Sequence, residues 1–272
     1  MSRSQNMLST VTPWEMVAEG YAETTMKLFR SYTEKALEVA RLSRESAILD
    51  VACGPGTLPL LAAGQVNSVH AIDFSESMIK LFIQEVEAVG LSNIEIHCGD
   101  GQELPFSDEM FDAAFSMFGL MFFPDRNKGY AEIYRTLKPG GKILISSWAP
   151  VAESPVMQAM FGALKAMQPE IPEPQTDIES LENPEFFKTE LHNAGFNDVE
   201  IHPVSGEYPI SDLEEFWRDM VKGSAPIIML KNSMSPEEWE EKEGVALDYL
   251  QHTLPSLPTS LCAKAWLGCG VK

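Results

Sequence analysis

Short apolar runs alternate with amphipathic stretches through the middle of the chain, from residue 46 to about residue 150. Short apolar runs bounded by turn residues are typical of strands buried in a parallel sheet. The stretches between them place apolar residues three and four positions apart, which indicates helices. We expect strands at residues 47–51, 68–72 (ending in Asp73), 93–98, 111–117 and 142–148, and helices at residues 57–63, 75–89 and 127–137, the last of them ended by Pro139-Gly140-Gly141.

The flanking segments carry looser patterns of the same two kinds. We expect helices at residues 14–42, 151–167, 184–194, 212–222 and 236–250, strands at 197–204 and 261–271, and a proline-rich connector at 169–174. The predicted fold is therefore α/β and Rossmann-like, with a mostly parallel seven-stranded sheet, helices on both faces and a helical cap. The predicted division is an N-terminal helical lid (1–45), a cofactor-binding core (46–150), a cap insertion (151–183), a core helix and strand (184–205), a helical cap (206–258) and a final core strand (259–272).

The overall charge narrows the class of partner. The chain has 272 residues and a formal net charge of −20, and its Lys and Arg residues are scattered singly. Nucleic-acid binders owe most of their affinity to basic clusters that neutralise phosphates, so we expect no nucleic-acid partner. No run of 18 apolar residues and no N-terminal apolar signal core is present, so we expect a cytoplasmic protein without a membrane span. The oligomeric state is left open.

The cysteine and histidine residues carry no motif. Cys53, Cys98, Cys262 and Cys269 form no C-x-x-C pair, and no Cys/His set has the spacing of a zinc site. We therefore expect reduced cysteines and no metal. None of the five histidines stands out as a general base, so the catalytic residues remain unassigned.

A glycine-rich turn follows the first predicted strand, in the segment Asp50-Val51-Ala52-Cys53-Gly54-Pro55-Gly56-Thr57. Glycine lets the backbone approach a ligand closely and adopt dihedral angles that other residues avoid. The carboxyl ends of the strands are also where open α/β sheets bind ligands. The turn therefore predicts a ligand site at this end of the sheet.

Two acidic residues follow the next two strands. Asp73 ends the second strand, where an acid in nucleotide-binding folds accepts hydrogen bonds from ribose hydroxyls. Asp100, in the Gly99-Asp100-Gly101-Gln102 turn, follows the third strand and could accept a hydrogen bond from an adenine amine. Both residues favour a nucleoside ligand.

Five motifs in order carry a family resemblance: DVACGPGT, AIDFSESMI, HCGDGQELPF, FDAAFSMFGLMFFPD and RTLKPGGKILISSW. Together they resemble the class I S-adenosylmethionine-dependent methyltransferases of the type 11 group, which includes ubiquinone and menaquinone biosynthesis methyltransferases. The resemblance covers about residues 45–150. It implies S-adenosyl-L-methionine as cofactor, S-adenosyl-L-homocysteine as product and a small, partly hydrophobic methyl acceptor.

The resemblance also assigns roles to individual residues. It places Ala52, Gly54 and Gly56 against the methionine part of the cofactor, and Asp50 beneath the turn or at the amino group. It places Asp73 at the ribose, Phe74 and Met78 beside the adenine, and Asp100 and Gly101 at the adenine amine. Met117 and Phe118 are expected near the sulfonium, and Tyr21, with Trp14, on a helix that contacts cofactor or substrate. One departure is Ala52, where many members carry glycine; alanine is acceptable there if the residue keeps a negative φ.

Two alternatives stay open. A nicotinamide dinucleotide oxidoreductase also uses a G-x-G turn and an acid after the second strand, but Pro59 stands where its third glycine is required. A protein that binds S-adenosylmethionine without transferring its methyl group would keep the same motifs. The acceptor atom, whether O, N, C or S, is not determined by the sequence.

Overall fold

The computed structural model describes residues 7–172 and 180–272. Residues 1–6 of the predicted lid, and residues 173–179, which include Pro174 of the predicted connector and part of the predicted cap insertion, lie outside the described residues.

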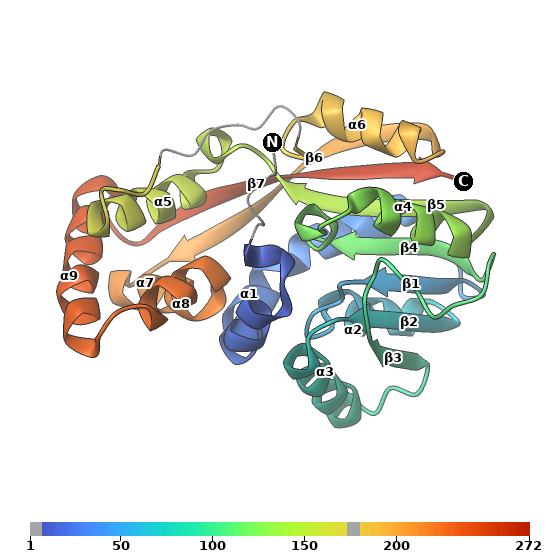
Figure 1. Ribbon diagram of the computed structural model, residues 1–272, viewed down its shortest axis with the longest axis horizontal. Helices are drawn as coiled ribbons and strands as arrows, with labels where there is room; N and C mark the ends of the chain where they lie inside the picture. The colour runs from blue at the N-terminus through green and yellow to red at the C-terminus, as the bar shows by residue number, and fades with distance from the viewer. Residues whose placement is uncertain (1–6, 173–179) are drawn as a thin grey trace.

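A seven-stranded sheet in the order β3-β2-β1-β4-β5-β7-β6 organises the chain (Figure 1). The first five strands run parallel, whereas β7 runs antiparallel to both β5 and β6. The expected Rossmann-like α/β fold with seven strands is confirmed, and the sheet is mixed rather than purely parallel. The strands are β1 (Ala47–Val51), β2 (Ser68–Asp73), β3 (Ile94–Cys98), β4 (Phe111–Met117), β5 (Leu137–Trp148), β6 (Asn197–Ile210) and β7 (Thr259–Val271).

Helices cover both faces of the sheet. On one face, α1, α2 and α3 pack their apolar sides on the central strands; on the other, α4 and α6 do so. Capping residues set the ends of α3: the Ser75 side chain accepts a hydrogen bond from the Met78 amide, and Gly90 ends the helix in the left-handed region. The helices are α1 (Val11–Ala40), α2 (Thr57–Ala62), α3 (Glu76–Val89), α4 (Arg126–Thr136), α5 (Pro155–Met167), α6 (Pro184–Asn193), α7 (Leu213–Gly223), α8 (Ala225–Asn232) and α9 (Pro236–Thr253).

A second core forms where β6 and β7 extend past the other strands. Helices α5, α7, α8 and α9 gather around this extension, at the left of Figure 1. Helix α1 is tied to the same region because the Tyr32 hydroxyl donates to the Ala263 carbonyl oxygen (2.6 Å) and accepts from the Gly206 amide (3.0 Å). The role of these four helices as a cap stays a prediction.

The main differences from the sequence-based expectation concern the α4–β5 junction, the length of β6 and helix α8. Helix α4 ends at Thr136 and β5 begins at Leu137, so Pro139-Gly140-Gly141 lies within the strand rather than ending the helix; Leu137 already pairs with Phe111. Strand β6 continues past residue 205 to Ile210 because its pairing with β7 continues to Thr259. Helix α8 was not expected, since its short apolar sequence has no amphipathic period.

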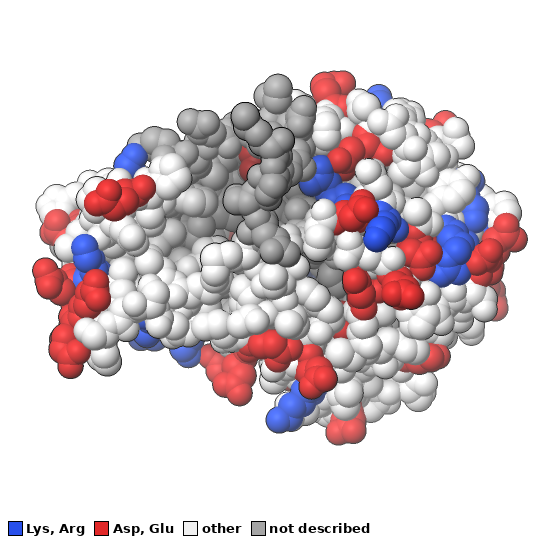
Figure 2. All heavy atoms as spheres, viewed as in Figure 1, with Lys and Arg blue, Asp and Glu red and all other residues white. Residues whose placement is uncertain are grey.

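Charged side chains are mixed over the surface. On the face in Figure 2, Lys and Arg side chains lie beside Asp and Glu side chains. The ion pairs of the described residues include Arg135 with Asp108 and Lys138 with Asp112. None of the described helices has both the length and the apolar character that a membrane span requires.

Candidate functional site

A cavity of ≈ 880 Å³ opens at the carboxyl ends of the parallel strands. Strand order reverses between β1 and β4, which is the point where open α/β sheets bind ligands. The cavity lies at this point. Ten of the twelve residues that the resemblance assigned to the cofactor line it: Tyr21, Ala52, Gly54, Asp73, Phe74, Met78, Asp100, Gly101, Met117 and Phe118.

The Asp73 carboxylate is fixed at the base of this cavity by the backbone. Its Oδ2 atom accepts a hydrogen bond from the Gly54 amide (2.8 Å), and its Oδ1 atom accepts one from the Ser75 amide (2.9 Å). The glycine-rich turn and the start of α3 therefore hold the carboxylate from two sides. Each carboxylate oxygen can accept further hydrogen bonds, so the group is still able to bind hydroxyls of a ligand.

Burial dominates the electrostatics of Asp73. The residue is only 6% exposed, and desolvation raises the pKa of its carboxyl to about 6, although the Ser75 and Gly54 amides favour the charged form. Burial, reinforced by the charge of Asp73, also raises the pKa of the nearby Tyr21 hydroxyl. A polar or positively charged ligand would relieve this cost.

Asp50 and Gly56 lie outside the cavity lining. Asp50 is buried directly behind the turn, and its Oδ1 atom has no hydrogen-bond partner within the protein. Burial raises the pKa of this carboxyl well above its usual range, and Asp73 adds to the effect. Gly56 has φ +92°, and a Cβ atom there would lie 2.2 Å from the Phe82 ring, so its glycine is required by packing against α3 rather than by the cavity.

Two residues at the cavity floor have left-handed backbone. Ala52 has φ +59°, so the condition under which an alanine is acceptable here, a negative φ, is not met. Phe118 also has a left-handed φ of +58°. The two positions are connected, because a Cβ atom on Gly119 would lie 2.4 Å from the Ala52 Cβ atom. Left-handed non-glycine residues are rare and gather at functional sites, where the surrounding fold holds them in place.

Aromatic residues from two distant segments form the outer wall. Trp14 and Tyr21 of α1 pack near each other, and the Trp14 ring lies 5.1 Å from Phe122, centroid to centroid. Hydrogen bonds also connect α1 to α3, because the Glu15 carboxylate accepts from the Ser77 amide and hydroxyl. The sequence reading did not assign Phe122 or Phe123 to the site, although both lie in the FGLMFFPD motif that carried the resemblance.

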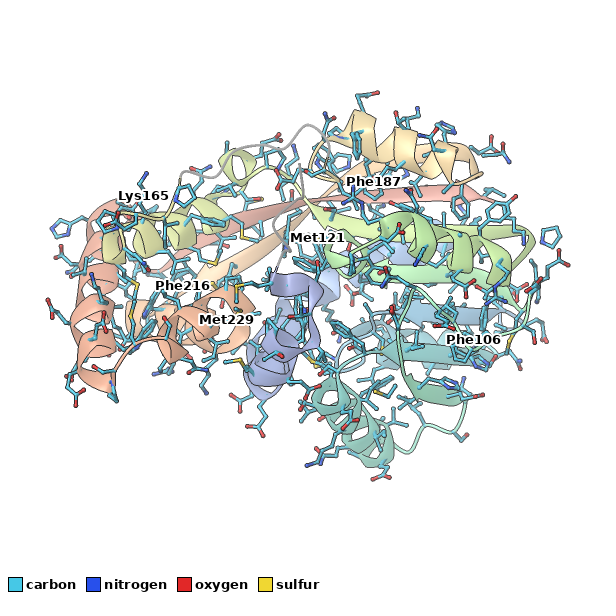
Figure 3. The ribbon with its side chains drawn as sticks, viewed as in Figure 1. Phe106, Met121, Lys165, Phe187, Phe216 and Met229 are labelled. Carbon is cyan, nitrogen blue, oxygen red and sulfur yellow. The ribbon has the colours of Figure 1, made fainter. Side chains whose placement is uncertain are left out.

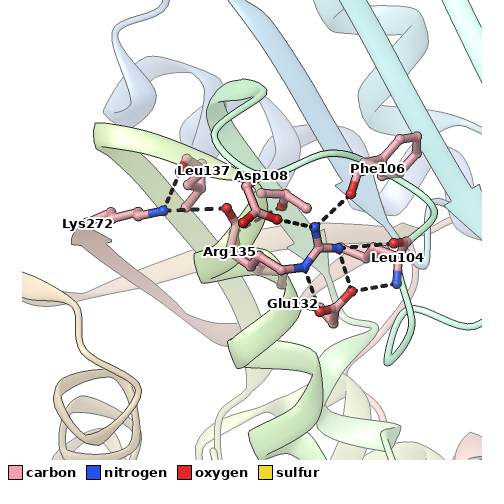
Figure 4. Close-up of polar contacts among 9 residues, drawn as sticks. Leu104, Phe106, Asp108, Glu132, Arg135, Leu137 and Lys272 are labelled. Atoms are coloured by element: carbon pink, nitrogen blue, oxygen red, sulfur yellow. Dashed lines mark hydrogen bonds and ion pairs between the residues drawn. The ribbon is translucent and has the colours of Figure 1, made fainter.

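The rim near Asp100 is held by helix α4. Asp100 accepts hydrogen bonds from the Gln102 amide and side chain, and the Gln102 side-chain oxygen accepts from the Asp125 amide. Further along this segment, the Arg135 guanidinium donates to the carbonyl oxygens of Leu104 (3.1 Å) and Phe106 (2.7 Å) (Figure 4). The same guanidinium pairs with the carboxylates of Glu132 and Asp108 (Figure 4). This network fixes the segment that connects the cavity rim to β4.

A second, larger cavity of ≈ 1320 Å³ adjoins the first. Its walls come from α1, α5, α7, α8 and the ends of β5 and β6, and they are mostly aromatic or aliphatic. Met121, labelled near the centre of Figure 3, lies in this wall. The two cavities share a boundary formed by Leu8, Trp14, Tyr21, Phe118 and Phe122.

The charge of both cavities is of one sign. No Lys, Arg or His is among the described residues that line either of them, whereas Asp73 and Asp100 line the first and Glu182 and Asp219 the second. In the second cavity, Tyr208 lies near Asp219; burial and then this carboxylate raise the pKa of its hydroxyl to about 12. Both cavities therefore favour neutral or positively charged ligands over phosphates.

Comparison with known proteins agrees with this geometry. Residues 49–145 match a family described as "Methyltransferase domain". The chain is 34% identical over 122 residues to demethylmenaquinone methyltransferase of Listeria welshimeri, a match covering 44% of this chain and 52% of that protein. The chain thus spans about half the length of the curated relatives it matches.

Two solved structures show how widely the fold is shared. Phosphoethanolamine N-methyltransferase 2 of Haemonchus contortus, in complex with S-adenosyl-L-methionine, superposes with a TM-score of 0.58 at 18% identity, covering 100% of this chain and 60% of that one. The [4+2]-cyclase SpnF superposes with a TM-score of 0.54 at 19% identity, covering 89% of this chain and 80% of that one.

Residues 49–145 are therefore similar to a methyltransferase domain, and the α/β fold and the cavity at the strand reversal agree with that similarity. The resemblance drawn from the five motifs is confirmed. The relatives in Listeria welshimeri and Bacillus subtilis are both named demethylmenaquinone methyltransferase.

Proposed function

We propose that this protein transfers the methyl group of S-adenosylmethionine to a small, largely apolar acceptor. The observation that carries the proposal is the shared boundary between two cavities. One cavity presents the carboxylate of Asp73 at the ends of the parallel strands, and the other is lined mainly by apolar side chains. A cofactor in the first and an acceptor in the second would meet beside Phe118.

The residues of the first cavity fit this cofactor. The Asp73 carboxylate, held by two backbone amides, would accept hydrogen bonds from ribose hydroxyls, and Phe74 and Met78 would offer apolar surface to an adenine ring. Two carboxylates in a cavity without a lining cation suit a sulfonium and oppose a pyrophosphate, which disfavours a dinucleotide. The unpartnered Oδ1 atom of Asp50 could take up a polar group or water near the turn.

The bound cofactor supplies a methyl group already activated by a positively charged sulfur. The protein then has to align the acceptor atom with that methyl and exclude water, and alignment alone can be worth roughly 7–11 kcal/mol. Phe118 and the α1 residues Trp14 and Tyr21 line both cavities and would do both, together with Met117 in the wall of the first cavity. No side chain is assigned as a general base.

The second cavity limits the acceptor to a neutral or cationic molecule with a broad apolar surface. Phe29, Phe118 and Trp148 stack closely there, with the Phe118 and Trp148 ring centroids 4.2 Å apart. An aromatic ring of quinone-precursor type matches these walls, and the names of the curated relatives support the same chemistry.

Two measurements test the proposal. Titration calorimetry with S-adenosylmethionine, S-adenosylhomocysteine and NAD should show binding of the first two only; binding of NAD alone would overturn the cofactor assignment. Release of S-adenosylhomocysteine should then be followed with matched acceptors that differ only in carrying a neutral hydroxyl or a phosphate. Transfer to the phosphorylated acceptors alone would refute the acceptor class.

A second candidate is a protein that binds S-adenosylmethionine without methyl transfer. The cyclase that shares this fold shows that the scaffold occurs in a protein named for a different reaction. Tight cofactor binding, without release of S-adenosylhomocysteine across a broad set of neutral and cationic acceptors, would favour this candidate over the first.

A further inference from the structure

A histidine–glutamate–histidine cluster lies on the β2–β3 edge of the sheet, away from both cavities. The pairing register places His70 of β2 opposite Glu95 of β3, and Ile72 opposite His97. Side chains two positions apart point to the same face of a strand, so His70, Glu95 and His97 project together. None of the three lines either cavity.

The atoms of this cluster converge on one point. The Nδ1 atom of His70 lies 3.4 Å from Glu95 Oε2, and the Nε2 atom of His97 lies 2.9 Å from Glu95 Oε1. One ligand atom from each residue lies within 4.8 Å of the others. Three atoms bound to one tetrahedral metal at about 2.0–2.2 Å would be roughly 3.3–3.6 Å apart, so the three side chains would have to close by up to about 1.5 Å to bind an ion.

Both histidine nitrogens are buried without a hydrogen bond. His70 Nδ1 and His97 Nε2 are shielded from solvent, and neither makes a hydrogen bond of acceptable geometry, even though Glu95 is close. A buried polar atom without a partner costs about 1–3 kcal/mol, and such atoms often mark a site for an ion. A metal ion bound between these two nitrogens and the Glu95 carboxylate would give both nitrogens a partner.

We propose that His70, Glu95 and His97 form a binding site for a divalent transition metal, with Zn²⁺ as the best fit. Two imidazoles and one carboxylate are a common zinc ligand set. Glu95 is 60% exposed at its side chain, so water can reach the ion and complete a fourth position. Phe106 and Phe111 pack against the histidine rings and shield the ion on the protein side.

A metal ion at this site would stabilise the edge of the sheet. Strand β3 pairs with β2 alone, and the Phe106 side chain, labelled beside β2 and β3 in Figure 3, lies in the segment that follows β3. Arg135 holds the backbone of this segment through the Phe106 carbonyl oxygen. A metal ion joining β2 to β3 would therefore stabilise the strands that end in Asp73 and at the rim near Asp100. The sequence predicted no metal because ligands from two strands share no short spacing motif.

A second group of possible ligands supplies a matched control. Glu200, His202 and Cys269 converge on the β6–β7 pair, but Cys269 Sγ already contacts His202 Nε2 at hydrogen-bonding distance (3.7 Å). These atoms satisfy each other, so this group has less need of an ion. The variant His202→Ala removes its central ligand and leaves the β2–β3 cluster intact.

The experiment is a calorimetric titration of chelator-treated protein with Zn²⁺, and with Mg²⁺ for comparison. Wild type and His202→Ala should share one tight Zn²⁺ site, and Mg²⁺ should not bind to it. His97→Ala and Glu95→Gln should each weaken that site by about 100-fold or more, because loss of a residue that only supports a ligand already costs about 10- to 100-fold. Both altered residues are partly exposed, and circular dichroism checks that each variant is folded.

The zinc-dependent thermal shift gives an independent readout. Zn²⁺ should raise the melting temperature of wild type and His202→Ala, and leave that of His97→Ala unchanged. The proposal fails if wild type binds no Zn²⁺ at micromolar concentration, or if His97→Ala and Glu95→Gln bind it as tightly as wild type. Neither result would bear on methyl transfer, since the cluster lies outside both cavities.

Discussion

Replacing Asp73 by asparagine tests the part of the site on which cofactor binding depends. The substitution keeps the shape of the side chain and removes its charge. One oxygen remains to accept from a backbone amide, while the new amide group faces either Gly54 or Ser75 with donor against donor. The variant therefore removes the charge at the base of the cavity together with one of the two backbone hydrogen bonds, and keeps the size of the side chain.

The expected loss follows from the number of hydrogen bonds to the charged group. Hydrogen bonds to charged groups contribute about 1.5–3 kcal/mol each. Loss of one such bond to a ribose hydroxyl corresponds to roughly a 10- to 150-fold increase in Kd, and loss of two to more. We expect Asp73→Asn to weaken binding of S-adenosylhomocysteine by at least about tenfold at pH 7.5, and Asp73→Ala to weaken it at least as much.

Asp112→Asn is the matched control. Asp112 also accepts a hydrogen bond from a backbone amide, that of Ala47 (2.8 Å), but it pairs with Lys138 and lines neither cavity. Calorimetry of wild type and both asparagine variants, with the folded fraction checked by circular dichroism, separates binding from stability. An affinity for S-adenosylhomocysteine within threefold of wild type in folded Asp73→Asn would refute the ribose role.

Three further perturbations test the surroundings of the site. The pKa of Asp73 is about 6 in the folded protein against an ordinary 3.8, so the folded state binds the proton more tightly than the unfolded state. The free energy of unfolding should therefore fall by about 3 kcal/mol as the pH rises from about 4 through 6. Urea unfolding from pH 4 to 8 should show this decline in wild type relative to Asp73→Asn, and parallel curves would contradict it. Ala52→Gly should leave the free energy of unfolding unchanged or raise it by up to about 1 kcal/mol, because relief of the left-handed strain of alanine outweighs the conformational entropy that glycine loses on folding. A clear decrease of this free energy in urea unfolding would disprove the strain argument. Arg135→Lys should lower the free energy of unfolding by about 2–3 kcal/mol, because an ammonium cannot donate to Leu104, Phe106 and Glu132 at once. A melting curve like that of wild type would show that these simultaneous hydrogen bonds of the guanidinium are unimportant.

The sequence alone determined the repeating part of the fold. Each buried parallel strand appears as an apolar run, and helices α3 and α4 have their own N-capping residues, Ser75 and Asp125. Such local signals depend on neighbouring residues only, so β1 to β4 could be predicted almost to the residue. The acid at the end of β2 and the glycine turn after β1 could be predicted for the same reason.

Contacts between distant residues were decided by the tertiary structure. The left-handed Ala52 depends on its fit against Gly119, the glycine at position 56 on the Phe82 ring, and the length of β6 on its pairing with β7. The union of two cavities at Phe118 and the meeting of His70 with His97 also need the folded sheet. Periodicity records which side of an element is buried, but not which residue from another element lies against it, and these features depend on that second choice.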